Sequence, residues 1–268
     1  MTKGVFWLTA VLLAALSGLS VLAAERLVVA CPLKPDPPPN IDGDSREWDH
    51  LPVEIMVGAA NVTWGKAKWD GEDDLSGLVK LCHDANYLYV LAEVVDEKVT
   101  IAGGKDMFHC DHVEITFAPA FDPAGSGPLR PDWRIIGLCP GTMAPTGDIF
   151  SDIEPEAYLH HPINTDSSAI DVGASPSENG FVLEARIPWK LLGVPKPPKP
   201  GQAFGFDIHL SDSDSGTTQE TMTSLNPVPW AGRKQENILK LILTGTDGKL
   251  PVEAAPRFEP QKNTDKGR

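Results

Sequence analysis

The sequence lacks the short motifs of the common hydrolases and phosphate-binding enzymes. It contains no Gly-x-Ser-x-Gly, no His-Glu-x-x-His and no glycine-rich loop that would cradle a phosphate. A pair of carboxylates could in principle cleave a glycoside. In a chain with 37 Asp and Glu residues, however, such pairs arise by chance. We therefore expect a protein that is not an enzyme.

Basic residues are few, and long stretches without proline or glycine are rare. The chain has 23 Lys and Arg against 37 Asp and Glu, a formal net charge of −14 at pH 7. This charge opposes binding to nucleic acid or anionic lipid, and it suits cations or neutral ligands. The chain has 25 prolines and 24 glycines, and both residues weaken helix interiors, so we expect no long helices.

Cysteine is scarce as well. The four cysteines are Cys31, Cys82, Cys110 and Cys139, and their wide spacing is not that of a zinc ribbon. They allow three disulfide pairings, and the sequence decides neither among these nor between disulfides and buried free thiols. The run of residues 109–112, His-Cys-Asp-His, resembles a metal cluster. Successive side chains of a strand point to opposite faces, so one ion could not easily collect all four.

An apolar segment, residues 5–22, follows Lys3 at the N-terminus. It ends in Ala23-Ala24, small residues of the kind that signal peptidase accepts, and Glu25 follows at once. We expect residues 1–24 to be a cleaved signal peptide rather than a membrane anchor. The mature protein would then be secreted or periplasmic, with no membrane insertion after cleavage.

Later segments alternate apolar and polar side chains with a period of two, which is typical of strands with one face on a core. The apolar sets are Leu88, Val90, Ala92 and Val94; Val113, Ile115 and Phe117; Phe181, Leu183, Ala185 and Ile187; and Phe204, Phe206, Ile208 and Leu210. The opposite faces carry Glu114, Glu184, Arg186 and His209.

Two packed sheets satisfy this alternation best. The sequence therefore predicts an all-β fold, an antiparallel β-sandwich of the jelly-roll or immunoglobulin-like kind with long loops, over residues 25–244. We expect loops at residues 40–48 and 141–165, and a polar tail at residues 245–268. Trp48 and Trp189, beside turns, are expected to pack inside, whereas Trp64 and Trp69 flank a lysine-containing loop and could touch a ligand.

Six groups of short segments occur in a familiar order. They are Ile41-Asp42-Gly43 with Trp48; Asp74-Leu75-Ser76; Tyr87-Leu88-Tyr89-Val90 running to Val95-Asp96; Asp111 with Val113-Glu114-Ile115; Leu183-Glu184-Ala185 with Ile187-Pro188-Trp189; and Gly205-Phe206-Asp207 with Asp212. Over about residues 27–243, this set resembles the family 9 carbohydrate-binding modules.

The resemblance implies a sandwich that binds a poly- or oligosaccharide without hydrolysing it. Two aromatic rings of the family clamp the sugar, and their positions fall on Phe108 and Trp230. The polar partners of the sugar fall on Glu114, Arg134 and His209. Phe108 stands where the family usually has tryptophan, and His209 stands where it has an amide.

The resemblance also implies structural calcium, and the acidic loops agree with it. Carboxylate oxygens are the ligands that calcium prefers. The candidate ligands are Asp74, Asp96, Asp212 and Asp214. No contiguous loop of the EF-hand kind is present, so separate segments would have to assemble the site.

Two other functions remain open from the sequence. A related sandwich carries haem in some molybdenum dehydrogenases, and Met107 and Met222 could then be the ligands of an electron-transfer subunit. Alternatively, the chain could be a cell-surface interaction domain that kept the sandwich and lost the sugar site. The residues at positions 108 and 209 favour that alternative.

Overall fold

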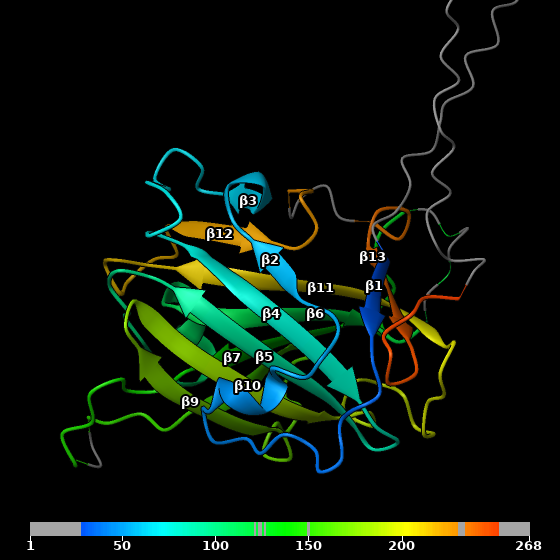
Figure 1. The fold of residues 1–268 in the computed structure, drawn as a ribbon. Coiled ribbons are helices and arrows are strands. Elements are labelled where there is room, and N and C mark those ends of the chain that lie inside the picture. Colours follow the sequence, from blue (N-terminus) through cyan, green and yellow to red (C-terminus); the bar gives the residue numbers. More distant parts are fainter. Residues whose placement is uncertain are drawn as a thin grey trace, which may run out of the picture.

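The computed structural model describes residues 28–120, 122, 125, 127–148, 151–229 and 234–251. The described residues form a β-sandwich, and Figure 1 shows the smaller sheet in front of the larger one. The larger sheet has the order β1-β13-β11-β6-β7-β8, with β12 paired to β11 and β3 paired to β12. The smaller sheet has the order β2-β4-β5-β10-β9. The predicted fold class is confirmed, although β1 and β13 pair in parallel.

The elements are short and connected by long loops. The larger sheet contains β1 (Val28–Cys31), β3 (Val62–Trp64), β6 (His112–Ala118), β7 (Arg134–Cys139), β8 (Glu156–His161), β11 (Ala203–Asp212), β12 (Thr221–Ser224) and β13 (Leu239–Leu243). The smaller sheet contains β2 (Ile55–Val57), β4 (Ser76–His83), β5 (Tyr87–Val95), β9 (Asp171–Ser177) and β10 (Gly180–Pro188). Short 3-10 helices are η1 (Ser45–Trp48), η2 (Ala59–Asn61) and η3 (Gly104–His109). In the described part of the chain, no helix has the length and apolar character needed to cross a membrane.

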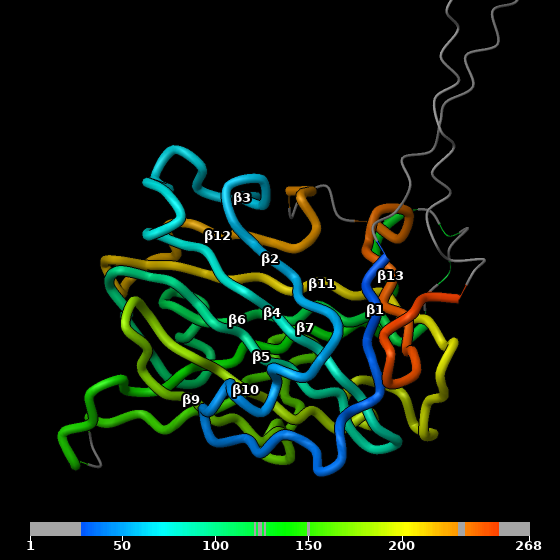
Figure 2. The backbone as a smooth tube through the Cα atoms, viewed as in Figure 1, coloured from blue at the N-terminus to red at the C-terminus, as the bar shows by residue number. Residues whose placement is uncertain are grey.

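The core lies between the two sheets. All four apolar sets with period two point into it, as the alternation predicts. Aromatic rings fill one end, where the centroid of Phe204 lies 5.1 Å from that of Phe117 and 5.5 Å from that of Trp189. Each such buried side chain stabilises the fold by about 1.5–3 kcal/mol. Figure 2 shows β1, in blue, beside β13, in orange, so both ends of the described chain lie along one edge of the larger sheet.

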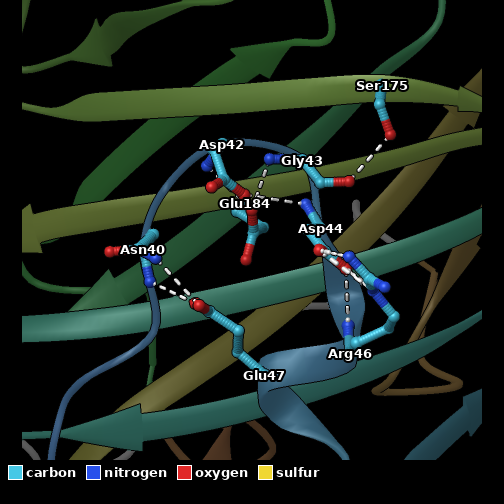
Figure 3. Close-up of polar contacts among 8 residues, drawn as sticks. All are labelled: Asn40, Asp42, Gly43, Asp44, Arg46, Glu47, Ser175 and Glu184. Atoms are coloured by element: carbon cyan, nitrogen blue, oxygen red, sulfur yellow. Dashed lines mark hydrogen bonds and ion pairs between the residues drawn. The ribbon is translucent and has the colours of Figure 1, made fainter.

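Glu184 on β10 holds residues 40–48 against the outer face of the smaller sheet (Figure 3). Its carboxylate is fully buried and accepts hydrogen bonds from Gly43 N at 2.6 Å and from Asp42 N at 3.1 Å. It also accepts one from the indole nitrogen of Trp48 at 2.5 Å. Gly43 has a φ of 85°, and a Cβ there would lie 2.6 Å from the carbonyl carbon of Ala174. The motif residues Asp42, Gly43, Trp48 and Glu184 therefore serve to hold this loop on the sheet. Burial raises the pKa of Glu184, and its hydrogen bonds act in the opposite direction.

The prediction of an uninterrupted loop over residues 141–165 is wrong, because β8 lies inside it. Only Leu159 of this strand is buried in the core, so β8 shows little apolar alternation. The register also shifts: Ile135 pairs with His161 and Ile136 pairs with Leu159, which leaves His160 as the extra residue of a β-bulge. An edge strand with a bulge gives almost no signal of period two.

The four cysteines are buried, and none of them forms a disulfide. Cys31 lies in the main core, whereas Cys82 packs near Trp48 and Tyr89 on the other side of the smaller sheet. Burial raises the pKa of Cys139 to about 11. The structure thus favours the second of the two alternatives, buried thiols of low reactivity.

Candidate functional site

An open cavity of about 420 Å³ lies on the outer face of the larger sheet. Its floor contains His112 and Glu114 of β6 and Ile135 of β7. Side chains alternate along a strand, so the neighbouring residues Val113 and Ile115 point into the core. The remaining lining residues are Thr63, Trp64, Phe108, His160, Gln219, Met222 and Pro229.

Phe108 forms one wall of this cavity, as the family resemblance implies for a sugar-binding ring. It lies in η3, and its ring rests above Gly137 of β7, where a Cβ would come within 2.8 Å of Cζ. The ring centroid lies 4.8 Å from that of His160, 4.9 Å from that of His112 and 6.3 Å from that of Tyr158. These contacts hold the half-buried ring in one position.

Trp64 forms part of another wall and is 56% exposed. The sequence named both Trp64 and Trp69 as residues that could touch a ligand. Only Trp64 lines the cavity, because Trp69 packs against the core and donates its indole N–H to Leu75 O at 3.0 Å. Trp230, the second ring that the resemblance implies, lies outside the described residues. Its neighbour Pro229 lines the cavity.

Glu114 and His209 lie together, but only Glu114 lines the cavity. Oε1 of Glu114 lies 3.6 Å from Nε2 of His209. The imidazole is fully buried, with Nδ1 2.8 Å from Ser224 Oγ and Nε2 3.2 Å from Thr116 Oγ1. Glu114 retains 15% exposure. The structure therefore places His209 behind Glu114, where it can orient the carboxylate but does not line the cavity itself.

His112 is a floor residue that the sequence did not single out for sugar binding. Its Nδ1 lies 2.9 Å from the carbonyl oxygen of Cys110. A carbonyl only accepts hydrogen bonds, so Nδ1 carries the proton and Nε2 is left as an acceptor. Burial lowers the pKa of His112 to about 4, so the ring is neutral at pH 7. The sequence did contain one signal for this role: His112 lies two residues before Glu114 on one strand, so the two side chains point to the same face.

The structure does not bring Arg134 to the cavity. Arg134 begins β7 and points away from the face on which Ile135 lines the cavity. Its Nε donates to Leu191 O at 2.9 Å, and one terminal nitrogen donates to Trp133 O at 3.1 Å. Burial lowers the pKa of Arg134. The guanidinium thus ties the start of β7 to a neighbouring loop.

A cluster of three acidic side chains lies next to the start of β6, which Asp111 directly precedes. Carboxylate oxygens of Asp96, Asp111 and Asp212 lie within 4.8 Å of one another, and all three residues are buried. Burial is the largest cause that raises their pKa values, to about 6 for Asp96, about 9 for Asp111 and about 7 for Asp212, and the repulsion between the carboxylates adds to it. Oδ2 of Asp96 is buried without a hydrogen-bond partner. Converging oxygens of this kind fit a hard cation.

The sequence named four candidate calcium ligands, and the structure groups them differently. It brings Asp96 and Asp212 together and adds Asp111, which the sequence noted in the family motif and in the run of residues 109–112 but not as a calcium ligand. Asp74 and Asp214 are half-buried and close enough for their charges to help raise the pKa values of Asp96 and Asp212. Neither supplies an oxygen to the close group of three.

Comparison with known proteins identifies the family. The profile described as carbohydrate family 9 binding domain-like matches residues 41–125 and 156–233, together more than half of the chain. A carbohydrate binding module of family 9 from Caldicellulosiruptor kristjanssonii has the same fold in two solved structures, one with cellotriose and one with glucose.

Both structures superpose with a TM-score of 0.57 and 20% sequence identity. The cellotriose complex covers 88% of this chain and 100% of its own, and the glucose complex covers 84% and 98%. No curated protein matches the sequence. On the strength of the profile match, the chain belongs to the carbohydrate family 9 binding domain-like family.

Proposed function

We propose that this protein binds an oligosaccharide in the cavity on the larger sheet and does not cleave it. The observation that carries the proposal is the pairing of two aromatic walls, Trp64 and Phe108, with the acceptors His112 and Glu114 on the floor. A sugar ring has apolar C–H faces and a rim of hydroxyl groups. A site for it therefore needs flat aromatic rings and a few fixed polar groups.

The family and the neighbouring structures support this proposal. Members of the family are described as carbohydrate-binding, and the fold neighbour holds cellotriose in one structure and glucose in the other. We also propose that residues 1–24 are a signal peptide through which the protein is exported, and that it acts beside enzymes of polysaccharide degradation. N-terminal sequencing of the mature protein, expected to begin at Ala24 or Glu25, tests the export.

Titration calorimetry with cello- and xylo-oligosaccharides tests the binding. Phe108→Ala and Glu114→Gln should each weaken binding of a sugar that the unmodified protein binds by about 1.5–3 kcal/mol, ten- to a hundredfold or slightly more. Phe108 is half-buried and Glu114 retains only 15% exposure, so we expect each variant to lose about 0.5–3 kcal/mol of folding stability and to stay folded, which melting curves check. Glu93→Gln is the matched control, since Glu93 is half-buried on the other sheet.

Several results would contradict the proposal. These are the absence of binding to any of these sugars, unchanged affinity in both variants, or release of reducing ends from the oligosaccharide. The first of them would favour the interaction-domain alternative.

We further propose that Asp96, Asp111 and Asp212 hold a calcium ion. The unpartnered buried oxygen of Asp96 supports this, because a buried acceptor without a partner is costly unless something satisfies it. When bound, the ion supplies positive charge that neutralises the cluster. The protein's own residues do the rest: Asp111 accepts hydrogen bonds from Thr100 N and, at 2.6 Å, from Ser213 N, and so joins three loops.

The haem alternative finds less support in the structure. Met222 lines the cavity, whereas Met107 is fully buried and is not among the lining residues. The structure therefore does not bring both methionines to one open site. A Soret band in the purified protein would reverse this preference.

A further inference from the structure

The β-bulge on β8 places two histidines at the larger sheet's outer face. His160, the unpaired residue, lines the cavity beside Phe108, with ring centroids 4.8 Å apart. His161 pairs with Ile135, whose side chain is on the cavity floor, and paired residues share a face of a sheet. Bulges are common where a strand re-aims a side chain beside a functional site. The bulge thus puts a second imidazole directly beside the cavity floor.

Trp133 lies against this second imidazole. The ring centroids of Trp133 and His161 are 5.5 Å apart, with an interplanar angle of 41°. Trp133 directly precedes β7 and comes two residues before Ile135 in the chain. Nε2 of His161 lies 3.2 Å from Pro131 O, which fixes the imidazole. The indole and the imidazole form a supported aromatic surface next to the cavity.

Two charged residues with exposed side chains precede Trp133 in the chain. Arg130 and Asp132 form an ion pair at 3.3 Å, and each side chain remains substantially exposed. A sugar unit that lay on the indole would meet a donor and an acceptor beside it. The arrangement repeats the elements of the cavity, an aromatic plane with polar neighbours, just before the start of β7.

We propose that Trp133 and His161 form an outer subsite that holds the part of an oligosaccharide chain extending out of the cavity. This inference rests on the proposed function, because the chain must be anchored in the cavity to reach Trp133. Ile135 lines the cavity and pairs with His161, and the ring of His161 contacts the indole of Trp133. Because the floor and this aromatic surface are continuous, an oligosaccharide that extends past Ile135 would reach the indole. The protein would then respond to chain length as well as to the sugar in the cavity.

Affinity measured against chain length tests the proposal. We would titrate glucose and the series from cellobiose to cellopentaose into the full mature protein and into the variant Trp133→Ala. The variant should bind the short sugars unchanged and lose about three- to tenfold in affinity for the longest, the loss expected for one aromatic contact. Phe108→Ala should weaken binding at every length. Trp133→Phe should retain most of the affinity for long chains.

The outcomes distinguish failure of the outer subsite from failure of the proposed sugar-binding function. Equal losses at all lengths, or no loss at any length, would overturn the outer subsite and leave the cavity site intact. If the unmodified protein binds neither these sugars nor a series of xylo-oligosaccharides, both the outer subsite and the proposed sugar-binding function are overturned. If melting curves show that Trp133→Ala unfolds, His161→Ala makes the same test, since it removes the support of the indole while leaving β7 unchanged.

Discussion

The position of the Phe108 ring depends on one glycine. A Cβ at Gly137 would lie 2.6 Å from Sδ of Met107 and 2.8 Å from Cζ of Phe108, both closer than side chains tolerate. We expect Gly137→Ala to push the aromatic ring out of its place and to weaken sugar binding by about tenfold or more. The overpacking should destabilise the fold by about 1–3 kcal/mol. Calorimetry and melting curves on the same samples measure both effects.

Gly245→Ala is the matched control for this variant. A Cβ there would meet only Asp247 Oδ1, at 3.8 Å, which is an ordinary contact. Affinity and stability should both stay close to those of the unmodified protein. If Gly137→Ala binds sugar as well as this control does, the position of the Phe108 ring does not matter for binding. The assignment of Phe108 to the sugar site would then be wrong.

The spacing of the family motifs predicted Phe108 and Glu114 as residues of one site, and both line the cavity. The spacing did not predict the surroundings of several other residues. His209 and Glu184 fall on the expected strand faces, yet both are fully buried. Residues 42–48 cover Glu184, and side chains of the neighbouring strands β6 and β12 pack around His209. A period of two tells which face a side chain takes and says nothing about what lies above that face. Trp64 was ambiguous for a related reason: only the pairing of β3 with β12 places its ring over the cavity.

The segment of η1 and its preceding loop is held by side-chain contacts more than by a sheet. Three donors, from Trp48, Gly43 and Asp42, converge on the single buried carboxylate of Glu184. We expect Glu184→Ala to destabilise the fold by about 3 kcal/mol or more, because it leaves buried donors without an acceptor. Sugar affinity of the folded protein should not change, since β10 belongs to the other sheet. Urea denaturation and calorimetry measure these quantities.

Glu154→Ala, at an exposed loop position, is the control and should lie within about half a kcal/mol of the unmodified protein. A Glu184→Ala protein that is just as stable would mean that the buried carboxylate is not what fixes this loop. A loss of sugar affinity in folded Glu184→Ala would show instead that the two sheets communicate.

Strands with apolar alternation were predictable from the sequence, whereas β8 and the β3–β12 pair were not. β5, β6, β10 and β11 each bury one full apolar face between the sheets, which gives a strong pattern of period two. β8 places only Leu159 in the core and carries the bulge, and β3 has no buried residue. These weakly patterned edge elements supply His160, His161 and Trp64. The sequence therefore predicted the scaffold better than the site.

Strand β6 connects the two candidate sites of the molecule. Asp111 of the acidic cluster directly precedes His112, and Glu114 follows on the same face two residues later. The segment before Asp111 is η3, which carries Phe108. The acidic cluster therefore lies beside the segments that carry one wall of the cavity, Phe108, and part of its floor, so an ion bound there would also hold these sugar-binding residues in place.

The acidic cluster makes stability depend on pH in a direction that calcium should reverse. The folded protein raises the pKa values of Asp96, Asp212 and Asp111 from an ordinary 3.8 to about 6, 7 and 9. The unfolded chain releases these protons near pH 4, while the folded chain still holds them. Their contribution to stability is thus fully present below about pH 4 and is lost as the pH rises to about 9.

Calcium binds the deprotonated carboxylates, so its stabilising effect should grow over the same range of pH. At a hundredfold excess over its dissociation constant it adds about 2.7 kcal/mol. That raises the melting temperature of a domain this size by roughly 5–10 °C. We expect melting curves with chelator and with millimolar calcium to diverge from pH 5 to pH 8. Asp111→Asn should remove the difference, and exposed Asp247→Asn should keep it. Curves that coincide at pH 8, where the competition from protons is weakest, would show that the cluster holds no calcium.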